Sequence, residues 1–435
     1  MIPERFKIAD NIELSEIKTD KFKSELFTFT VGLPLTKSNI AHNMLLTAVL
    51  KRGTKSYPSL AELNRRLDEL YSSSLDIKSS RLGKNLTLTV TADVLDSHYI
   101  PDGTDVLGGV LDIIAETFYS PKLTEEGVFP TAIVEQEKKF LIEGISSIVN
   151  NTRAYATTRL SELVFRNDPE FPTMEELKEL VSAITSETLT DFYRKLRHYT
   201  KLRVFHVGNT AQDIISKEIK SRFTPWSVCD AVSTTLPYAE PINEYVSITE
   251  KMPVSQGKLA MCFNVDACIS PNDNKQYTAM VLNEIFGGSA ASKLFMNVRE
   301  KRSLCYYCSS SYDRYTGLIT VSSGIESTNR QIAEDAILSE LKDIHSGKIS
   351  QAELDAAKKS LLNSYRQTED SPYDLQGYYA NREYFDFTEN IEIAKEKISE
   401  VSIIDVSRLA SEIVYTATFF VEGIEDNEEE AQYDE

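Results

Sequence analysis

The side chains with the clearest chemical capacity lie in a short run, Arg299-Glu-Lys-Arg-Ser-Leu-Cys-Tyr306. A guanidinium and a phenolic O–H can both donate to an oxygen that gains negative charge in a transition state, and losing one such donor typically slows a reaction by about 10²–10³-fold. We place Arg299 at the end of a helix that starts near Ala290 and Tyr306 at the start of a strand, so a tight turn can direct both side chains to one side. The structural alternative is ordinary, because cations favour a helix C-terminus and tyrosine is common in strands.

The same run contains a C-x-x-C spacing at Cys305 and Cys308. Residues three apart on a strand point to opposite faces, so we expect these two thiols to be separated. No second C-x-x-C completes a zinc set, and five cysteines in a chain of this length do not indicate a disulfide framework. The cysteines are therefore predicted to be buried structural thiols.

The composition limits what the whole chain can be. With 435 residues, of which 41% are hydrophobic and 26% charged, the chain is long enough for two globular domains of about 200 residues. A formal charge of −19 argues against nucleic acid or an anionic membrane as a partner. No apolar stretch is long enough to span a bilayer and the first residues lack the apolar core of a signal peptide, so a cytoplasmic setting is the default expectation.

The elements that must position the Arg–Tyr run recur twice along the chain. Apolar strands at 25–36 and 259–270 each lead into a helix, strand pairs follow at 75–92 and 306–323, and each half then has long amphipathic helices and a late strand, at 202–207 and 416–421. This order predicts an α+β fold with two duplicated domains, each a mostly antiparallel sheet packed with helices. We expect domains at 1–224 and 241–424, a linker at 225–240 and an acidic tail at 425–435.

Three further motifs accompany the Arg–Tyr run: Leu50-Lys-Arg-Gly-Thr54, Tyr119-Ser-Pro-Lys-Leu123 and Phe286-Gly-Gly-Ser-Ala-Ala-Ser-Lys-Leu-Phe295. With that run and the duplication, they resemble the pitrilysin/insulinase-type zinc peptidases, the family that includes the mitochondrial processing peptidase. The resemblance covers nearly the whole chain. It implies that the two domains form half of a clam-like chamber, and that the Arg–Tyr run faces a zinc ion held by an H-x-x-E-H helix.

The chain departs from the family at that helix. The resemblance places the five motif positions at 44–48, so that Met44 and Ala48 stand where the family has histidines and Thr47 where it has its general base. Catalytic zinc needs three protein ligands and a water, which these side chains cannot hold. Apolar residues at helical spacing suggest that a packed core face replaces the metal; these are Ile40, Ala41, Met44, Leu45, Ala48 and Val49.

The family's third ligand position is best matched by Glu135, on a helix spanning 133–145. Without histidines, Glu135 is most simply a solvated acid that pairs with Lys138 or Lys139. The five histidines, at 42, 98, 198, 206 and 345, are each solitary, with no second histidine four residues on. We therefore expect no metal and no other cofactor in this chain.

In heterodimeric members of the family, one subunit carries the zinc and the other supplies the Arg–Tyr pair. The resemblance thus implies an active zinc-binding paralogue as partner, with Arg299 and Tyr306 acting in trans on an extended peptide substrate. The chain is especially similar to inactive members found in Gram-positive bacteria, which are associated with elongation factor P modification. A purely structural or peptide-binding pseudoenzyme, possibly a homodimer, remains the alternative.

Substrates of the family pair with an exposed strand edge. The matching strand here is Leu75-Asp-Ile-Lys-Ser-Ser80, with Leu75, Ile77 and Ser79 as the substrate-strand residues. Backbone pairing needs no particular side chain, so peptide binding could survive the loss of zinc. The alternative is an edge that Asp76 and Lys78 protect by their charge.

Overall fold

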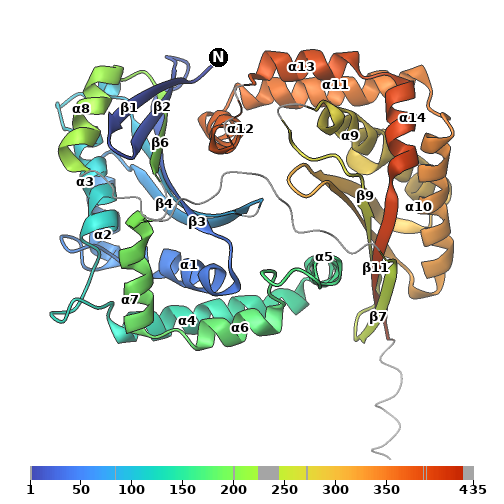
Figure 1. Cartoon of the computed structure of the whole chain (residues 1–435), viewed down its shortest axis with the longest axis horizontal. Coiled ribbons are helices and arrows are strands. Elements are labelled where there is room, and N and C mark those ends of the chain that lie inside the picture. Colours follow the sequence, from blue (N-terminus) through green and yellow to red (C-terminus); the bar gives the residue numbers. More distant parts are fainter. Residues whose placement is uncertain are drawn as a thin grey trace, which may run out of the picture. The chain divides into compact units, whose positions relative to one another are not determined.

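The computed structural model describes residues 2–83, 85–198, 201–223, 244–270, 273–385, 387 and 389–424. The chain forms two compact units (Figure 1). Unit 1 comprises Met1–Ser146, Pro172–Pro237 and Gln367–Asn390; unit 2 comprises Ser147–Phe171, Tyr238–Arg366 and Ile391–Glu435. The expected linker at 225–240 and tail at 425–435 lie outside the described residues. No helix within the described ranges is long and apolar enough to cross a membrane.

Unit 1 is built on a six-stranded sheet with the strand order β1-β2-β6-β3-β5-β4. Neighbouring strands are antiparallel, except that β2 and β6 run parallel. The strands are β1 (Glu4–Ala9), β2 (Ile12–Lys18), β3 (Ser24–Pro34), β4 (Ser74–Leu82), β5 (Asn85–Leu95) and β6 (Leu202–Gly208).

Successive side chains of β3 point to opposite faces of this sheet, and helices pack on both faces. Phe27, Phe29 and Val31 point into the main core, which helices cover. On the opposite face, Thr28 accepts a hydrogen bond from Gln376 of α12 at 3.3 Å. The helices of unit 1 are α1 (Lys37–Leu50), α2 (Leu60–Glu69), α3 (Val106–Tyr119), α4 (Thr131–Ser146), α6 (Met174–Ser182), α7 (Ser186–Lys195), α8 (Gln212–Arg222) and α12 (Pro372–Tyr384), with the short turns η1 (Ser97–Tyr99) and η3 (Leu196–His198).

Unit 2 repeats this plan with a five-stranded sheet in the order β7-β11-β8-β10-β9. Here the parallel pair is β7 and β11. The strands are β7 (Val246–Met252), β8 (Gly257–Asn264), β9 (Cys305–Asp313), β10 (Leu318–Ile325) and β11 (Val414–Gly423). The helices are α5 (Thr152–Val164), α9 (Lys275–Asn283), α10 (Arg330–His345), α11 (Gln351–Thr368), α13 (Ile391–Glu400) and α14 (Ile403–Glu412), with π-helical turns η4 (Glu284–Gly288) and η5 (Leu294–Lys301) and 3-10 turns η2 (Ser147–Asn150) and η6 (Ser327–Asn329).

The predicted duplication is confirmed by the two strand orders. In each unit the first apolar strand, β3 or β8, is central. The hairpin that follows places its second strand beside the central strand and its first strand, β4 or β9, at the sheet edge. The late strand, β6 or β11, lies beside the central strand on its other side. The α+β class and the mostly antiparallel sheets are therefore as the sequence predicted.

Each unit also contains one helix from the other half of the sequence. Helix α5 packs on β8 and β11 of unit 2, where its Ala156 and Leu160 join a core with Ala260 and Phe419 (Figure 1). Helix α12, which follows α11 as α5 follows α4, packs against β6 and β3 of unit 1. The compact units thus differ from a simple division of the chain into two contiguous domains, because segments 147–171 and 367–390 are exchanged.

Candidate functional site

Helix α1 carries the degenerate metal-binding positions. The Thr36 hydroxyl caps its first turn by accepting from the Asn39 N–H at 3.0 Å. The Thr47 hydroxyl donates to the Met44 carbonyl at 2.9 Å, which occupies the side chain at the general-base position. Met44 and Ala48 are only half-buried. The predicted core face is therefore wrong at these two positions, because the helix turns a different stripe to the core; that stripe consists of Ala41, Leu45, Leu46, Val49 and Leu50.

Two acids of α4, Glu135 and Glu137, lie in different environments, one exposed and one buried. Glu135 is exposed and pairs with the mostly buried Lys138 at 2.9 Å, so the predicted pairing of a solvated acid is confirmed. Glu137 is 5% exposed and accepts a hydrogen bond from the Arg52 Nε, just beyond α1, at 2.6 Å. The acid of α4 that reaches the end of α1 is thus Glu137, and a guanidinium neutralises it.

These side chains do not fit a zinc ion. The Asn43 amide, next to the first motif position, donates to the Ser79 hydroxyl at 2.7 Å and to the Thr87 carbonyl at 3.1 Å. The imidazole of His42 contacts the Ser38 carbonyl through Nδ1 at 2.8 Å. Across the described ranges, no three His, Cys, Asp or Glu side chains gather as metal ligands could. Helix α1 and its neighbours therefore offer no ligand set for a catalytic zinc ion.

Two of the motifs that accompany the Arg–Tyr run, at 50–54 and 119–123, lie against each other beside α1. Thr54 forms an antiparallel bridge with Pro121, and the Lys55 N–H donates to the Ser120 carbonyl at 2.9 Å. Gly53 has φ of +142°, and a Cβ there would lie 2.5 Å from the Tyr57 carbonyl oxygen, so only glycine fits the turn. The motif after α1 therefore fixes the path of the chain rather than a chemical group.

Arg299 lies near the end of η5, as the sequence predicted for a helix C-terminus. Its guanidinium stacks over the Phe295 ring, 4.6 Å from the centroid, and lies 3.5 Å from the Glu300 carboxylate. The side chain is 38% exposed. Ser303, with φ of +51°, forms the turn into β9, and the Leu304 N–H donates to the Val298 carbonyl at 3.2 Å. The turn is therefore tight, and Arg299 remains reachable from solvent.

Tyr306 lies on β9, at the edge of the unit 2 sheet, and is 61% exposed. Close packing positions this strand, because a Cβ on Gly287 of η4 would lie 2.6 Å from the Ser310 hydroxyl. Among the described residues, no hydrogen bond or ring contact joins Tyr306 to Arg299. The structure thus places the pair on adjoining elements, with both side chains available to a ligand.

A bulge in β9 changes the expected placement of the two cysteines. Cys308 lies opposite Ser323 and Cys305 opposite Ile325, so four residues of β9 face three of β10. Both thiols therefore point to the same buried face, and the expectation of opposite faces is wrong. A hydrogen bond from Cys308, opposed by burial and aided by the charge of Arg299, lowers the pKa of Cys305. Both thiols are buried, as predicted.

The predicted substrate strand is β4, the edge of the unit 1 sheet. Ile77 is buried, and Leu75 and Ser79 are half-buried. The Ile77 N–H donates to the Asp76 carboxylate at 2.9 Å, and that carboxylate also binds Lys51 at 2.8 Å and Lys78 at 3.0 Å. Although burial opposes them, these lysines lower the pKa of Asp76. One backbone donor of this edge is thus already occupied.

Sequence reasoning missed a buried ionic cluster in unit 1. His206 on β6 is fully buried between Glu16 on β2, 3.2 Å from Nδ1, and Glu25 on β3, 2.9 Å from Nε2. His206 is therefore not solitary. Burial lowers its pKa, but hydrogen bonds to the two carboxylates outweigh burial and raise the pKa. Only the strand order β2-β6-β3 reveals this cluster, since the three residues are far apart in the sequence.

Comparison with known proteins gives a consistent set of relatives. A model of the peptidase M16 inactive domain matches residues 183–361. A Bacillus subtilis protein named probable inactive metalloprotease YmfF is 30% identical over 94% of this chain and 95% of its own length. A second B. subtilis protein, the uncharacterized zinc protease YmxG, is 22% identical over 63% of this chain and 62% of its own length.

Solved structures agree with the fold. A conserved protein from Enterococcus faecalis V583 superposes with a TM-score of 0.88 at 28% identity, covering 98% of this chain and 100% of that one. A peptidase M16 inactive domain from Pseudomonas fluorescens gives 0.79 at 15% identity, covering 97% and 98%. A protease from Helicobacter pylori gives 0.76 at 14% identity, covering 97% and 100%.

Proposed function

We propose, from the premise that this chain belongs to the M16 peptidase family, that it is the non-catalytic subunit of a heterodimeric zinc metalloendopeptidase acting on peptides. On its own the chain is an inactive M16 homologue. In the complex it would supply Arg299, Tyr306 and half of the substrate chamber. The observation that carries the proposal is the contrast between a helix α1 without zinc ligands and an Arg–Tyr pair that is still exposed at a sheet edge.

The zinc would belong to the partner subunit, a paralogue with an intact H-x-x-E-H helix. Relatives of both kinds occur in one organism, because B. subtilis has one protein named an inactive metalloprotease and another named a zinc protease. That co-occurrence supports a division of labour between two chains. Purifying the tagged chain from its native cell and identifying a stoichiometric partner is the direct test; recovery of only self-associated chain would contradict it.

The Arg–Tyr pair would act on the oxygen that gains negative charge when the partner's zinc-bound water attacks a peptide carbonyl. The Tyr306 O–H and the Arg299 guanidinium are both donors, and the acid nearest to Arg299 is its exposed neighbour Glu300. In the reconstituted complex, we expect Arg299→Ala or Tyr306→Phe to lower kcat by about 10²–10³-fold without dissociating the subunits.

Arg302→Ala is the matched control for this experiment. Arg302 lies in the same turn and carries the same charge, but its guanidinium lies 3.8 Å from the buried Glu340. The acid beside Arg299 is instead the exposed Glu300. Turnover and subunit affinity should both stay near wild type in this variant. Unchanged turnover in both Arg299→Ala and Tyr306→Phe would refute the assignment of the pair to transition-state stabilisation.

A second candidate function is peptide binding without catalysis, and the exposed edge of β4 favours it. An extended peptide could add a strand beside β4, since the sheet ends there. The isolated chain would then bind an extended peptide, and the Arg299 and Tyr306 substitutions would change no measurable activity. The peptide measurement therefore separates the two candidates.

A further inference from the structure

We propose that unit 2 contains an oxyanion-binding site that takes a carboxylate or a phosphate group. The site is a cavity of about 280 Å³ between the first turn of α5 and strands β9 and β10. Apart from Arg153, its walls consist mainly of hydroxyl and amide side chains; these include Asn151, Thr157, Ser309, Ser311, Thr320 and Ser322. The inference is independent of the Arg299–Tyr306 pair and of any partner subunit.

Arg153 in the cavity wall and Lys258 on the neighbouring strand β8 have no acidic partner in the described part of the chain. The Arg153 Nη2 donates to the Ser309 hydroxyl at 3.2 Å, and its guanidinium lies 4.3 Å from the centroid of the Tyr307 ring. The Lys258 Nζ lies 5.8 Å from the same centroid and contacts the Gln256 amide oxygen. No carboxylate within the described ranges pairs with either cation. Burial and the charge of Arg153 both lower the pKa of Lys258.

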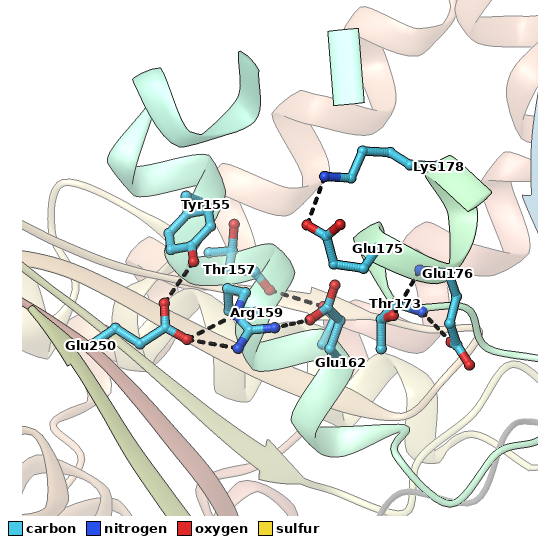
Figure 2. Close-up of polar contacts among 10 residues, drawn as sticks. Tyr155, Thr157, Arg159, Glu162, Thr173, Glu175, Glu176, Lys178 and Glu250 are labelled. Atoms are coloured by element: carbon cyan, nitrogen blue, oxygen red, sulfur yellow. Dashed lines mark hydrogen bonds and ion pairs between the residues drawn. The ribbon is translucent and has the colours of Figure 1, made fainter. Parts of the chain in front are cut away.

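The absence of a counter-charge is unusual for this helix. Arg159, further along α5, is held by Glu250 at 2.6 Å and by Glu162, and the Tyr155 hydroxyl also donates to Glu250 at 2.6 Å (Figure 2). This network attaches α5 to β7. In a chain of formal charge −19, acids are abundant. Arg153 is therefore the α5 arginine whose charge remains available to a ligand.

The sheet positions the donors around the cavity. Tyr307, Gly324 and Lys258 are aligned across β9, β10 and β8, and Ser309 and Ser322 form the next row. A Cβ on Gly324 would lie 2.5 Å from the Tyr307 ring, so glycine lets that ring lie across the sheet. The Tyr307 hydroxyl is buried near Ser322 of the cavity wall, without a hydrogen bond of normal geometry.

This arrangement suits an oxyanion for general reasons. A guanidinium matches the geometry of a carboxylate or phosphate with two parallel hydrogen bonds. Hydroxyl groups can donate to the remaining oxygens, and the N-terminus of α5 adds a favourable partial charge. Binding an anion would also relieve the repulsion between Arg153 and Lys258. The same chemistry admits the terminal carboxylate of a peptide or free phosphate.

Calorimetric titration of the full chain at low salt distinguishes these sources. The three titrants are inorganic phosphate, an N-acetylated tripeptide with a free carboxylate, and the same tripeptide as its amide. We expect one oxyanion to bind per chain, and to bind more weakly as pH rises through the lowered pKa of Lys258. Binding of the acid but neither the amide nor phosphate would assign the site to peptide carboxylates; binding of phosphate but neither peptide would assign it to free phosphate.

Arg153→Gln should weaken binding by roughly tenfold or more, and Lys258→Gln should weaken it less. Arg302→Gln, which removes the same charge from another part of unit 2, should leave affinity unchanged. Melting temperatures measured without ligand establish that each variant is folded. No binding of any oxyanion to the wild type, or equal weakening by Arg153→Gln and Arg302→Gln, would overturn the proposal.

Discussion

Units 1 and 2 share a sheet plan but differ in the polar side chains that stand out in each. In unit 1, two buried sets of charges are paired: His206 lies between two glutamates, and Glu137 is bound by Arg52. In unit 2, Tyr306 is 61% exposed and Arg153 has no acidic partner in the described part of the chain. The two units thus share a fold, while the exposed Tyr306 and the unpaired Arg153 belong to unit 2.

The two sheet edges show the same difference in more detail. On β4, the Asp76 carboxylate occupies the Ile77 N–H and is itself held by two lysines. On β9, the corresponding edge in unit 2, a bulge beside Cys305 accompanies the exposed Tyr306. A protected edge suits stability, and an irregular edge with exposed donors suits binding.

Among the substitutions that test this difference between the units, removal of His206 should have the largest effect on stability. We expect His206→Ala to lower the free energy of unfolding of unit 1 by about 3–5 kcal/mol, because two buried carboxylates lose their counter-charge. Denaturant unfolding followed by probes in each unit would measure this loss. The half-buried His42 is the control, and His42→Ala should cost less than about 1 kcal/mol. Equal costs for the two variants would contradict the special role of the cluster.

Removing Arg52 should have the next largest effect. In Arg52→Met, Glu137 loses its partner while buried, and we expect a loss of about 1–3 kcal/mol in the free energy of unfolding. Adding Glu137→Leu should recover part of that loss, because the unpaired charge is then absent. Lys139→Met, at an exposed pair with Glu143, should cost less than about 0.5 kcal/mol. Additive single and double variants would show that the two side chains do not interact.

The buried cluster should also give unit 1 a pH dependence. Because the pKa of His206 is raised above its ordinary 6.5, the stability it contributes is complete below about pH 6.5 and is lost as pH rises through the raised pKa. The pKa of Glu25 is lowered: burial opposes the shift, but His206 and Thr210 outweigh burial. Its contribution is therefore present above about pH 4.5 and lost as pH falls.

This dependence can be measured as the difference in unfolding free energy between the wild type and His206→Gln at several pH values. Above about pH 6.5, the difference should shrink by at most about 1.4 kcal/mol per pH unit. Unfolding of unit 2 should show no such change in the variant. A difference that stays constant from about pH 5 to 9 would exclude a charged His206.

The smallest expected effect concerns the protected edge. Asp76→Asn should weaken the hydrogen bond that the Ile77 N–H donates to the side chain of residue 76. This N–H would then be more available to an uncharged extended peptide, whose binding should strengthen by about 1 kcal/mol or less. Fluorescence anisotropy with a labelled peptide would detect this change. Asp10→Asn, at an exposed position near the other sheet edge, controls for net charge. Weaker binding in Asp76→Asn would mean that Asp76 contacts the peptide rather than excluding it.

The sequence predicted the parts of this molecule that local patterns determine. The repeated strands and the turn between Arg299 and Tyr306 follow from residue order and alternation, whereas the edge position of β4 is implied by the family resemblance. The bulge at Cys305 could not be predicted, because one extra residue in a strand leaves the alternation pattern almost unchanged. The His206 cluster depends on which strands are neighbours, and periodicity within a strand carries no information about that. Family resemblance, rather than local pattern, directed attention to Arg299 and Tyr306.

The exchanged helices have a consequence for the order in which the protein is completed during synthesis. Strands β3 and β6 of unit 1 are made early, but α12, which packs against them, ends at Tyr384. At about 5–20 residues per second, the polar face of that sheet waits roughly 10–30 s after β6 for its cover. Unit 2 has no such delay, since α5 is already made when β8 emerges. The first half of the nascent chain is therefore the half whose sheet keeps one face uncovered for longer during synthesis.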